Sequence, residues 1–262
     1  SEYRLILMAV DSDGNEAEAE RRFFLTDPLP DTPDADISSD VGPTDAAPDP
    51  GDIQIARAEI KKRRVESAFL GYHGFPATVC ASLNDEIVHG VPSQHTRLND
   101  GDVISVDLGI RLNGYFGDSA RTFAVGTISG EARRLLDVTR ESLRLGVDPG
   151  NRVSDIGYAV QTYVEQQGFS VVREFVGHGI GANLHEDPQI PNFGVPGRGL
   201  RLTPGMALAI EPMVNAGGPD VVLSADDGWT ARTKDGSLSA HFEVPVAVTE
   251  DGHQVLGGPL QG

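Results

Sequence analysis

The sequence contains one cysteine and few cationic residues for its length. Because Cys80 alone cannot form an internal disulfide, we expect a protein of a reducing compartment, namely the cytoplasm. Lys and Arg total 21 against 39 Asp and Glu, which gives a formal net charge of -18. Such a charge repels nucleic acids and anionic membrane surfaces, so we exclude both as main partners.

Long apolar runs are also missing. No stretch approaches the roughly 18 residues that a membrane-spanning helix needs. The apolar run from Leu5 to Val10 is too short for a secretory signal and is followed by acidic residues, so we expect no signal peptide. A chain of 262 residues with 39% hydrophobic residues is nevertheless long enough to bury a substantial core.

The composition of the chain changes near residue 52. From Asp27 to Asp52 the sequence holds eight Asp and six Pro but no Lys or Arg. Because proline removes backbone donors and like charges repel, we expect residues 1–52 to be a poorly ordered acidic segment. Within it, Tyr3 to Phe24 is compatible with either a strand or a helix. We expect the folded domain to comprise residues 53–262.

The folded part mixes helical and strand patterns. Periodicity predicts helices at residues 53–67, 131–147 and 154–167, the last with Ser154 as N-cap and Gly168 as its stop. Alternation predicts strands at residues 103–108, 119–125, 171–175, 206–210 and 240–248. The segments FLGYHG (69–74) and FVGHG (175–179) each follow a Pro-Gly pair and a helix. This echo indicates a duplicated α+β unit that encloses a central site.

Two of the candidate metal-binding acids, Asp107 and Asp118, lie on one predicted hairpin. The pair Asn113-Gly114 favours a two-residue turn. Such a turn pairs Asp107 with Ala120 and puts Asp118 on the same face as Asp107, roughly 7–8 Å away, unless a β-bulge shifts the register. A buried, unpaired carboxylate is costly in an apolar strand, so we favour a metal site over two solvated surface acids.

Two more acids follow this pattern in the C-terminal half. Glu211 ends an apolar strand, where Pro212 blocks further pairing. Glu243 shares one strand face with Ser239 and His241, while the intervening residues are apolar. Four carboxylates gathered in one site would repel one another. Two divalent cations would cancel that charge, and carboxylates with an imidazole suit such ions.

His178 and His185, within GHGIGANLHEDP, are the candidate imidazoles. The glycines at 177, 179 and 181 relax the backbone so that side chains can approach it closely. They do not match the GxGxxG motif of dinucleotide-binding proteins. The sequence also lacks HExxH, a P-loop and a G-x-S-x-G nucleophile motif. Cys80 has apolar neighbours, which favours packing over a role as nucleophile.

Together these segments resemble the type I, or bacterial-type, methionine aminopeptidases of the pita-bread metallopeptidase family. The resemblance runs from about Phe69 to Leu256 and includes FLGYHGFPATVCASLNDEIVHGVPS, EFVGHGIG, LTPGMALAIEPMVNAG and DDGWTARTKDGSLSA. It implies an α+β, pseudo-two-fold duplicated fold with a central antiparallel sheet backed by helices. It also implies an enzyme that removes the initiator methionine from nascent proteins whose second residue is small.

The resemblance assigns roles to individual positions. The implied ligands of two divalent metal ions (Co, Mn, Fe, Zn or Ni) are Asp107, Asp118, His178, Glu211 and Glu243. Asp118 and Glu243 would bridge both ions, and Glu211 would also shuttle a proton. His89 would contact the scissile amide, and His185 would polarise its carbonyl.

A substrate pocket is implied as well. Its residues would be Tyr72, Phe75, Cys80, His89, Leu184, His185 and Trp229. An apolar, aromatic slot with a polarizable cysteine suits a flexible thioether side chain. The implied partners are the N-termini of nascent polypeptides, met at the ribosome, and the implied oligomeric state is a monomer.

Several positions depart from the family pattern. Residues 1–50 do not resemble the two helices that usually precede the FLGYHG-type segment. His241, Val244 and Pro245 stand where the family usually has Gln, His and Thr, and Phe69 and Leu184 differ from common pocket residues. All five implied metal ligands are present.

Two alternatives stay open at this point. An X-Pro peptidase, either aminopeptidase P or prolidase, would share the fold and the ligands, and DLGIRLNGYFGDSARTF resembles those enzymes too. The segment EPMV, the Trp229 and Cys80 segments, and the lack of a folded N-terminal domain disfavour it. A catalytically silent binding protein on the same fold is the second alternative, but pure binding does not require all five ligands.

Overall fold

The computed structural model describes residues 2–10, 16–24, 51–93, 95–145 and 147–256. Three α-helices lie within them: α1 (Gly51–Arg63), α2 (Gly130–Ser142) and α3 (Val153–Gln166). The strands are β1 (Glu2–Val10), β2 (Glu16–Phe24), β3 (Glu66–Ser67), β4 (Cys80–Leu83), β5 (Glu86–Val88), β6 (Val103–Leu112), β7 (Tyr115–Ala124), β8 (Ser170–Val171), β9 (Gly177–Gly179), β10 (Glu186–Ile190), β11 (Ala207–Ile210), β12 (Met213–Asn215), β13 (Val221–Leu223), β14 (Ala231–Thr233), β15 (Ser239–His241), β16 (Val244–Val248) and β17 (His253–Val255).

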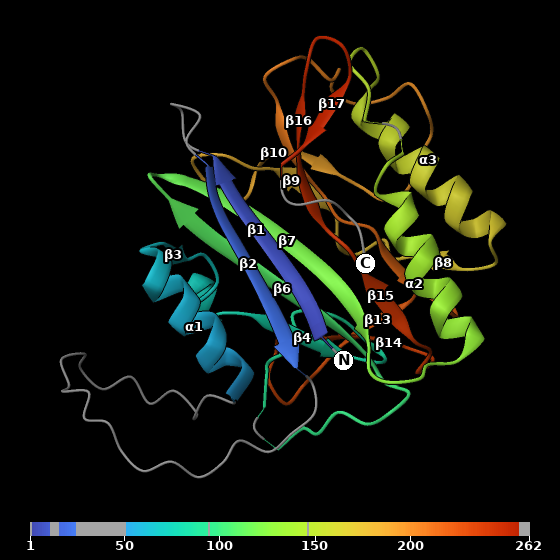
Figure 1. Cartoon of the computed structure of the whole chain (residues 1–262). Coiled ribbons are helices and arrows are strands. Elements are labelled where there is room, and N and C mark those ends of the chain that lie inside the picture. The colour runs from blue at the N-terminus through green and yellow to red at the C-terminus, as the bar shows by residue number, and fades with distance from the viewer. Residues whose placement is uncertain (1, 11–15, 25–50, 94, 146, 257–262) are drawn as a thin grey trace.

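Helices cover the antiparallel strands in both halves of the molecule. Helices α2 and α3 lie side by side along one side, and α1 lies against the other half (Figure 1). The larger apolar core joins α2 and α3 to β11 and β16, and includes Leu135, Val160, Leu208 and Val246. A second core lies under α1, against β4 and β6. The predicted arrangement of antiparallel strands backed by helices is therefore confirmed.

The central hairpin β6–β7 has the predicted register. Asn113 and Gly114 adopt φ values of 51° and 91°, as a two-residue turn with both central residues at positive φ requires. Asp107 pairs with Ala120, and Asp118 pairs with Gly109. Asp107 and Asp118 are therefore diagonal neighbours on one face, and both are buried.

Helix ends differ in detail from their predicted positions. Helix α1 stops at Arg63, where Arg64 takes φ 57°, and residues 66–67 already form β3. Helix α3 begins at Val153, so Ser154 is inside the helix and is not its N-cap. The Ser154 hydroxyl instead donates to the Arg198 carbonyl at 2.7 Å. Gly168 follows α3 with φ 83°, which confirms it as the stop.

The segment predicted as one strand at residues 240–248 is broken in two. Strand β15 ends at His241, and β16 begins at Val244. Within the break, the Glu243 amide donates to the Ala120 carbonyl at 2.8 Å, and the Ala120 amide donates back at 3.3 Å. This bridge joins the C-terminal half to β7, and so brings Glu243 to the acidic face of the central hairpin. The strand predicted at 171–175 is also shorter, at Ser170–Val171.

Near the N-terminus, β1 and β2 form an antiparallel hairpin that runs along β6 and β7 (Figure 1). This places strands where the sequence left strand and helix open. Residues 25–50, which hold most of the predicted acidic linker, lie outside the described residues, so their lack of order stays a prediction. None of the helices among the described residues is long and apolar enough to cross a membrane.

Candidate metal centre

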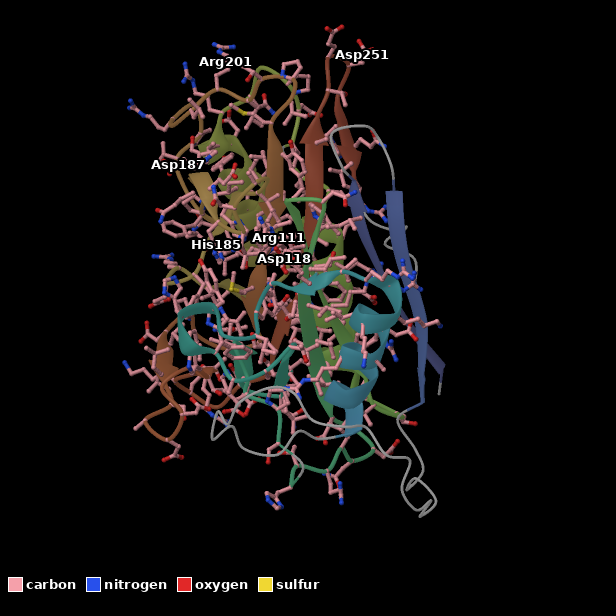
Figure 2. The ribbon with its side chains drawn as sticks, turned by 90° about the vertical axis from the view of Figure 1, so that its left-hand side faces the viewer. Arg111, Asp118, His185, Asp187, Arg201 and Asp251 are labelled. Atoms are coloured by element: carbon pink, nitrogen blue, oxygen red, sulfur yellow. The ribbon has the colours of Figure 1, made fainter. Side chains whose placement is uncertain are left out.

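One cavity of about 200 Å³ between the two halves collects every residue predicted for the site. Its lining comprises Phe69, Tyr72, Phe75, Cys80, Val88, His89, Asp107, Asp118, Phe175, Val176, His178, Leu184, His185, Glu211, Trp229 and Glu243. Figure 2 shows Asp118 and His185 near the middle of the molecule, whereas Arg201 and Asp251 lie at its outer end. The cavity is therefore central, as the internal echo predicts.

Acidic side chains from separate segments meet at the floor of this cavity. Asp107 and Asp118 come from β6 and β7, Glu211 follows β11, and Glu243 lies between β15 and β16. His178 projects from β9. Ligand atoms of Asp118, His178 and Glu243 all lie within 4.8 Å of one another, which is close enough for one metal ion.

The carboxylates in this cluster are hard to ionise together. Burial raises the pKa of Asp118 to about 7. Burial and then repulsion from neighbouring acids raise the pKa values of Asp107, Glu211 and Glu243 well above their usual range. Within the described part of the chain, Oδ1 of Asp107 and Oε1 of Glu243 are buried without a hydrogen-bond partner. A cation would satisfy these oxygens and allow the four groups to ionise.

His178 is held in the tautomer that a metal ligand needs. Its Nδ1 lies 2.9 Å from the Gly179 carbonyl oxygen, which can only accept, so the ring proton is on Nδ1. The bare Nε2 faces Oε1 of Glu211 at 3.6 Å. Two acceptor atoms thus face each other, and a cation between them would satisfy both. The donor set therefore fits a divalent metal.

Two further histidines carry no charge at neutral pH. Burial, with smaller effects of His178, His89 and His73, lowers the pKa of His185 to about 4. Burial also lowers the pKa of His89. The Tyr72 hydroxyl lies 2.8 Å from Nδ1 of His185, and this bond fixes the orientation of the His185 ring. His89 has a left-handed φ of 58°, an uncommon conformation for a non-glycine residue that often marks functional sites.

Apolar residues also line the cavity, beside the acidic cluster. Phe75 and Trp229 pack edge to face with their ring centroids 5.2 Å apart, beside buried Cys80 and Leu184. Burial, and then Asp107, raises the pKa of the Cys80 thiol well above its usual range. The thiol is therefore protonated at neutral pH, which supports the prediction that Cys80 packs and does not attack substrates.

The glycines beside His178 are needed for space. A Cβ on Gly177 would lie 2.4 Å from the Ala209 carbonyl oxygen, and a Cβ on Gly179 would lie 2.4 Å from that of Asp187. Neither residue has a positive φ. From the sequence, we expected these glycines to make the backbone flexible. In the structure they are needed because β9 packs closely between its two neighbouring strands, β10 and β11.

We predict that Gly179→Ala lowers the free energy of unfolding by about 2 kcal/mol, because the new methyl pushes against backbone that cannot rotate away. Gly181→Ala is the matched control, since its Cβ would meet only the Glu186 carboxylate end, at 3.1 Å. Denaturant unfolding of both variants measures the difference. Equal loss in the two variants would contradict the packing explanation.

Sequence reasoning left several lining residues out of the predicted site. Phe69 and Phe175 begin the two echoed segments, and both line the cavity. The echo could have identified Phe175, whereas Phe69 was noted only as a departure from common pocket residues. Val88 and Val176 gave no such signal, since each is one apolar residue in an apolar stretch. His241 was placed on the strand face of Glu243 and noted as a departure from the family pattern, but it was not predicted as a site residue. Its Nε2 lies 3.5 Å from Oε2 of Glu211.

A cluster of acids and an imidazole between the halves of an antiparallel fold fits a metal-dependent hydrolase. A model of metallopeptidase family M24 matches residues 52–250. Methionine aminopeptidase 1 of Bacillus subtilis (strain 168) is 55% identical over 206 residues, which cover 78% of this chain and 82% of that protein. The methionine aminopeptidase of Clostridium acetobutylicum is 52% identical with the same coverage. The chain belongs to metallopeptidase family M24 and, within it, to the methionine aminopeptidases.

Solved structures support the same assignment. The methionine aminopeptidase of Thermotoga maritima superposes with a TM-score of 0.76 at 45% identity, over 78% of this chain and 83% of that one. That of Rickettsia prowazekii has the same TM-score at 40% identity, with the same coverage. The predicted pita-bread fold is thereby confirmed. Prolidase from Pyrococcus furiosus, at 23% identity and a TM-score of 0.54, shares the fold alone. The X-Pro alternative is therefore not favoured.

Proposed function

We propose that this chain hydrolyses the first peptide bond of polypeptides that begin with methionine and have a small second residue. The observation that carries this proposal is the shared cavity, in which an apolar aromatic wall stands directly beside the acidic cluster. An unbranched thioether fits the wall, while the scissile bond meets the cluster. The high identity to methionine aminopeptidases supports the same conclusion.

We propose that the centre holds two divalent ions and that Asp107, Asp118, His178, Glu211 and Glu243 are their ligands. Support comes from the number of acids, three of them buried and Glu211 with a side chain 14% exposed, because a single divalent ion would leave the four carboxylates with a net negative charge. The ions would supply Lewis-acid activation of water and of the substrate carbonyl. Co, Mn, Fe, Zn and Ni all suit such a donor set.

The protein's own residues move protons and orient the substrate. Glu211 would take the proton of the attacking water and return it to the leaving amine. Neutral His185 would donate from Nε2 to the oxygen on which charge develops, with its Nδ1 accepting from the Tyr72 hydroxyl at 2.8 Å. His89 would contact the scissile amide from the apolar side, where it packs at right angles to Phe175.

The aromatic wall should decide how well methionine binds. We predict that Phe75→Leu lowers kcat/KM for a Met-Ala-Ser peptide about 10-fold, since it removes part of the apolar contact, worth about 1–3 kcal/mol. Metal affinity should not change. Phe116→Leu is the matched control, because Phe116 packs against the same core but does not line the cavity. Similar losses in both variants would show that stability, not substrate contact, is responsible.

The decisive assay compares two peptides on chelated and then metal-reloaded protein. One is Met-Ala-Ser, and the other carries a non-methionine first residue and Pro in second place. We expect metal-dependent release of methionine from the first peptide only. Cleavage of the X-Pro peptide alone would move the assignment to the rival peptidase. If neither peptide is cut although metal binds, the binding-protein alternative gains.

We further propose that residues 53–262 are the catalytic domain, and that it acts as a cytoplasmic monomer on nascent chains at the ribosome. The match of the family model to residues 52–250 supports the domain boundary. Sedimentation of the active enzyme tests the monomer, and co-sedimentation with translating ribosomes tests the location.

A further inference from the structure

A buried imidazole beside the acidic cluster has no role in the proposed mechanism. His241 ends β15 and is 2% exposed. Its Nε2 is buried and has no hydrogen-bond partner among the residues that the structure describes. A buried polar nitrogen left unpaired costs free energy, so its position calls for a compensating interaction. Its nearest charged neighbour is Glu211, whose Oε2 lies 3.5 Å from this Nε2.

Glu211 lies between two imidazoles that differ in what they can do. Oε1 faces Nε2 of His178 at 3.6 Å, and Oε2 faces Nε2 of His241 at 3.5 Å. The proton of His178 is on Nδ1, so its Nε2 cannot donate to Glu211. His241 carries no such constraint and can present an N–H to the carboxylate. One side of Glu211 is therefore suited to a cation and the other to a hydrogen-bond donor.

The main chain of His241 is held firmly in place. The His241 amide donates to the Thr122 hydroxyl at 2.8 Å, and that hydroxyl donates to the His241 carbonyl at 2.9 Å. The Ser105 hydroxyl, 2.8 Å away, then donates to Thr122. These buried bonds tie β15 to β7 and β6, the strands that carry Asp118 and Asp107. The imidazole is thus presented to Glu211 from a rigid support.

We propose that His241 is a positioning residue that donates a hydrogen bond from Nε2 to Oε2 of Glu211 and thereby orients this carboxylate toward the metal. The separation of 3.5 Å exceeds an ideal N–H···O distance by roughly 0.5 Å, which a small rotation of either side chain closes. The inference rests on the proposed metal role of Glu211. Partners of this kind commonly change metal affinity by about 10–100-fold.

Two substitutions of His241 distinguish the effect of losing the hydrogen-bond donor from the effect of losing the imidazole ring. In His241→Gln the side-chain amide supplies an N–H of similar reach, whereas His241→Leu fills a similar volume without any donor. We expect the Leu variant to bind Mn²⁺ about 10–100-fold more weakly by calorimetry and to change the visible absorption of bound Co²⁺. Its kcat for Met-Ala-Ser should fall with little change in KM. We expect the Gln variant to stay within about threefold of wild type in each measurement.

Thermal unfolding of the metal-free variants excludes a merely structural role. The 3.5 Å separation leaves this hydrogen bond unmade in the metal-free protein, so His241→Leu should not lower the metal-free unfolding temperature. Weaker metal binding together with undiminished metal-free stability would support positioning. A metal-free Leu variant that is strongly destabilised would assign His241 to the core and overturn the proposal.

Two other outcomes would also overturn it. Wild-type metal affinity and an unchanged Co²⁺ spectrum in His241→Leu would show that Glu211 needs no partner. An equal loss in the Gln and Leu variants would show that the imidazole itself binds the ion. The metal measurements do not require turnover, so they stand even if wild-type enzyme fails to release methionine, which would refute only the proposed function.

Discussion

Asp118→Asn should reduce kcat/KM for Met-Ala-Ser by about 10³-fold or more, which corresponds to at least about 4 kcal/mol of transition-state stabilisation. Asp118 is 5% exposed, and its carboxylate shares the 4.8 Å cluster with His178 and Glu243. An amide offers only one neutral ligand oxygen, so it cannot bridge two ions or balance their charge. Steady-state kinetics and metal content per protein measure the effect.

The fold should survive this substitution. Burial raises the pKa of Asp118 to about 7, so the ionised carboxylate destabilises the metal-free protein. A neutral amide of the same shape removes this destabilising charge. Asp251→Asn is the matched control, since Asp251 is exposed and lies far from the cavity (Figure 2). Full residual turnover in Asp118→Asn with normal metal content would refute the dinuclear centre.

Removal of the metal should abolish activity and make stability fall with rising pH. In the metal-free protein the folded-state pKa of Asp118, about 7, lies above its unfolded value of about 4. The stability that its proton provides is complete below about pH 4 and is lost as the pH rises toward 7. Each pH unit of that window costs about 1.4 kcal/mol per proton. The raised pKa values of Asp107, Glu211 and Glu243 add in the same direction.

Bound metal should reverse this trend, because the ion replaces the protons and binds the ionised carboxylates more tightly as pH rises. Unfolding temperatures at pH 5 and pH 8, with chelator and with Mn²⁺, give the test. We expect Mn²⁺ to raise the unfolding temperature more at pH 8 than at pH 5, and to restore activity. The metal-free Asp118→Asn variant distinguishes the effect of Asp118 from repulsion among the other negative charges of the chain. Its stability should fall less with rising pH than that of the metal-free wild type. A Mn²⁺ effect independent of pH would contradict the prediction.

Much of the site was predictable because its signals are local. The turn at Asn113-Gly114 sets the register of β6 and β7, and a one-residue slip would move Asp107 to the other face, so the pairing of the two acids followed from sequence alone. The apolar context of Glu211 and Glu243 marked them as costly unless paired with a cation. The resemblance of long motifs then named His178, and family membership bears out the class of enzyme.

Other features depend on contacts between distant segments. Tyr72 and His185 are 113 residues apart in the chain, and neither side chain signals the other. The break between β15 and β16 exists because Glu243 bridges to Ala120, whereas the local pattern predicts one continuous strand. This pairing joins backbone N–H and C=O groups, which nearly every residue has. Composition and periodicity therefore do not predict it.

Turn chemistry and strand alternation act over a few residues, so the acids and the hairpin register could be read from local patterns, and the long motifs identified the family. Contacts between distant segments were needed to place His241 opposite Oε2 of Glu211 and to show that Gly177 and Gly179 leave room for neighbouring strands. The physical reason is that these relations are set by distances between segments, and such distances follow from the packing of the whole core.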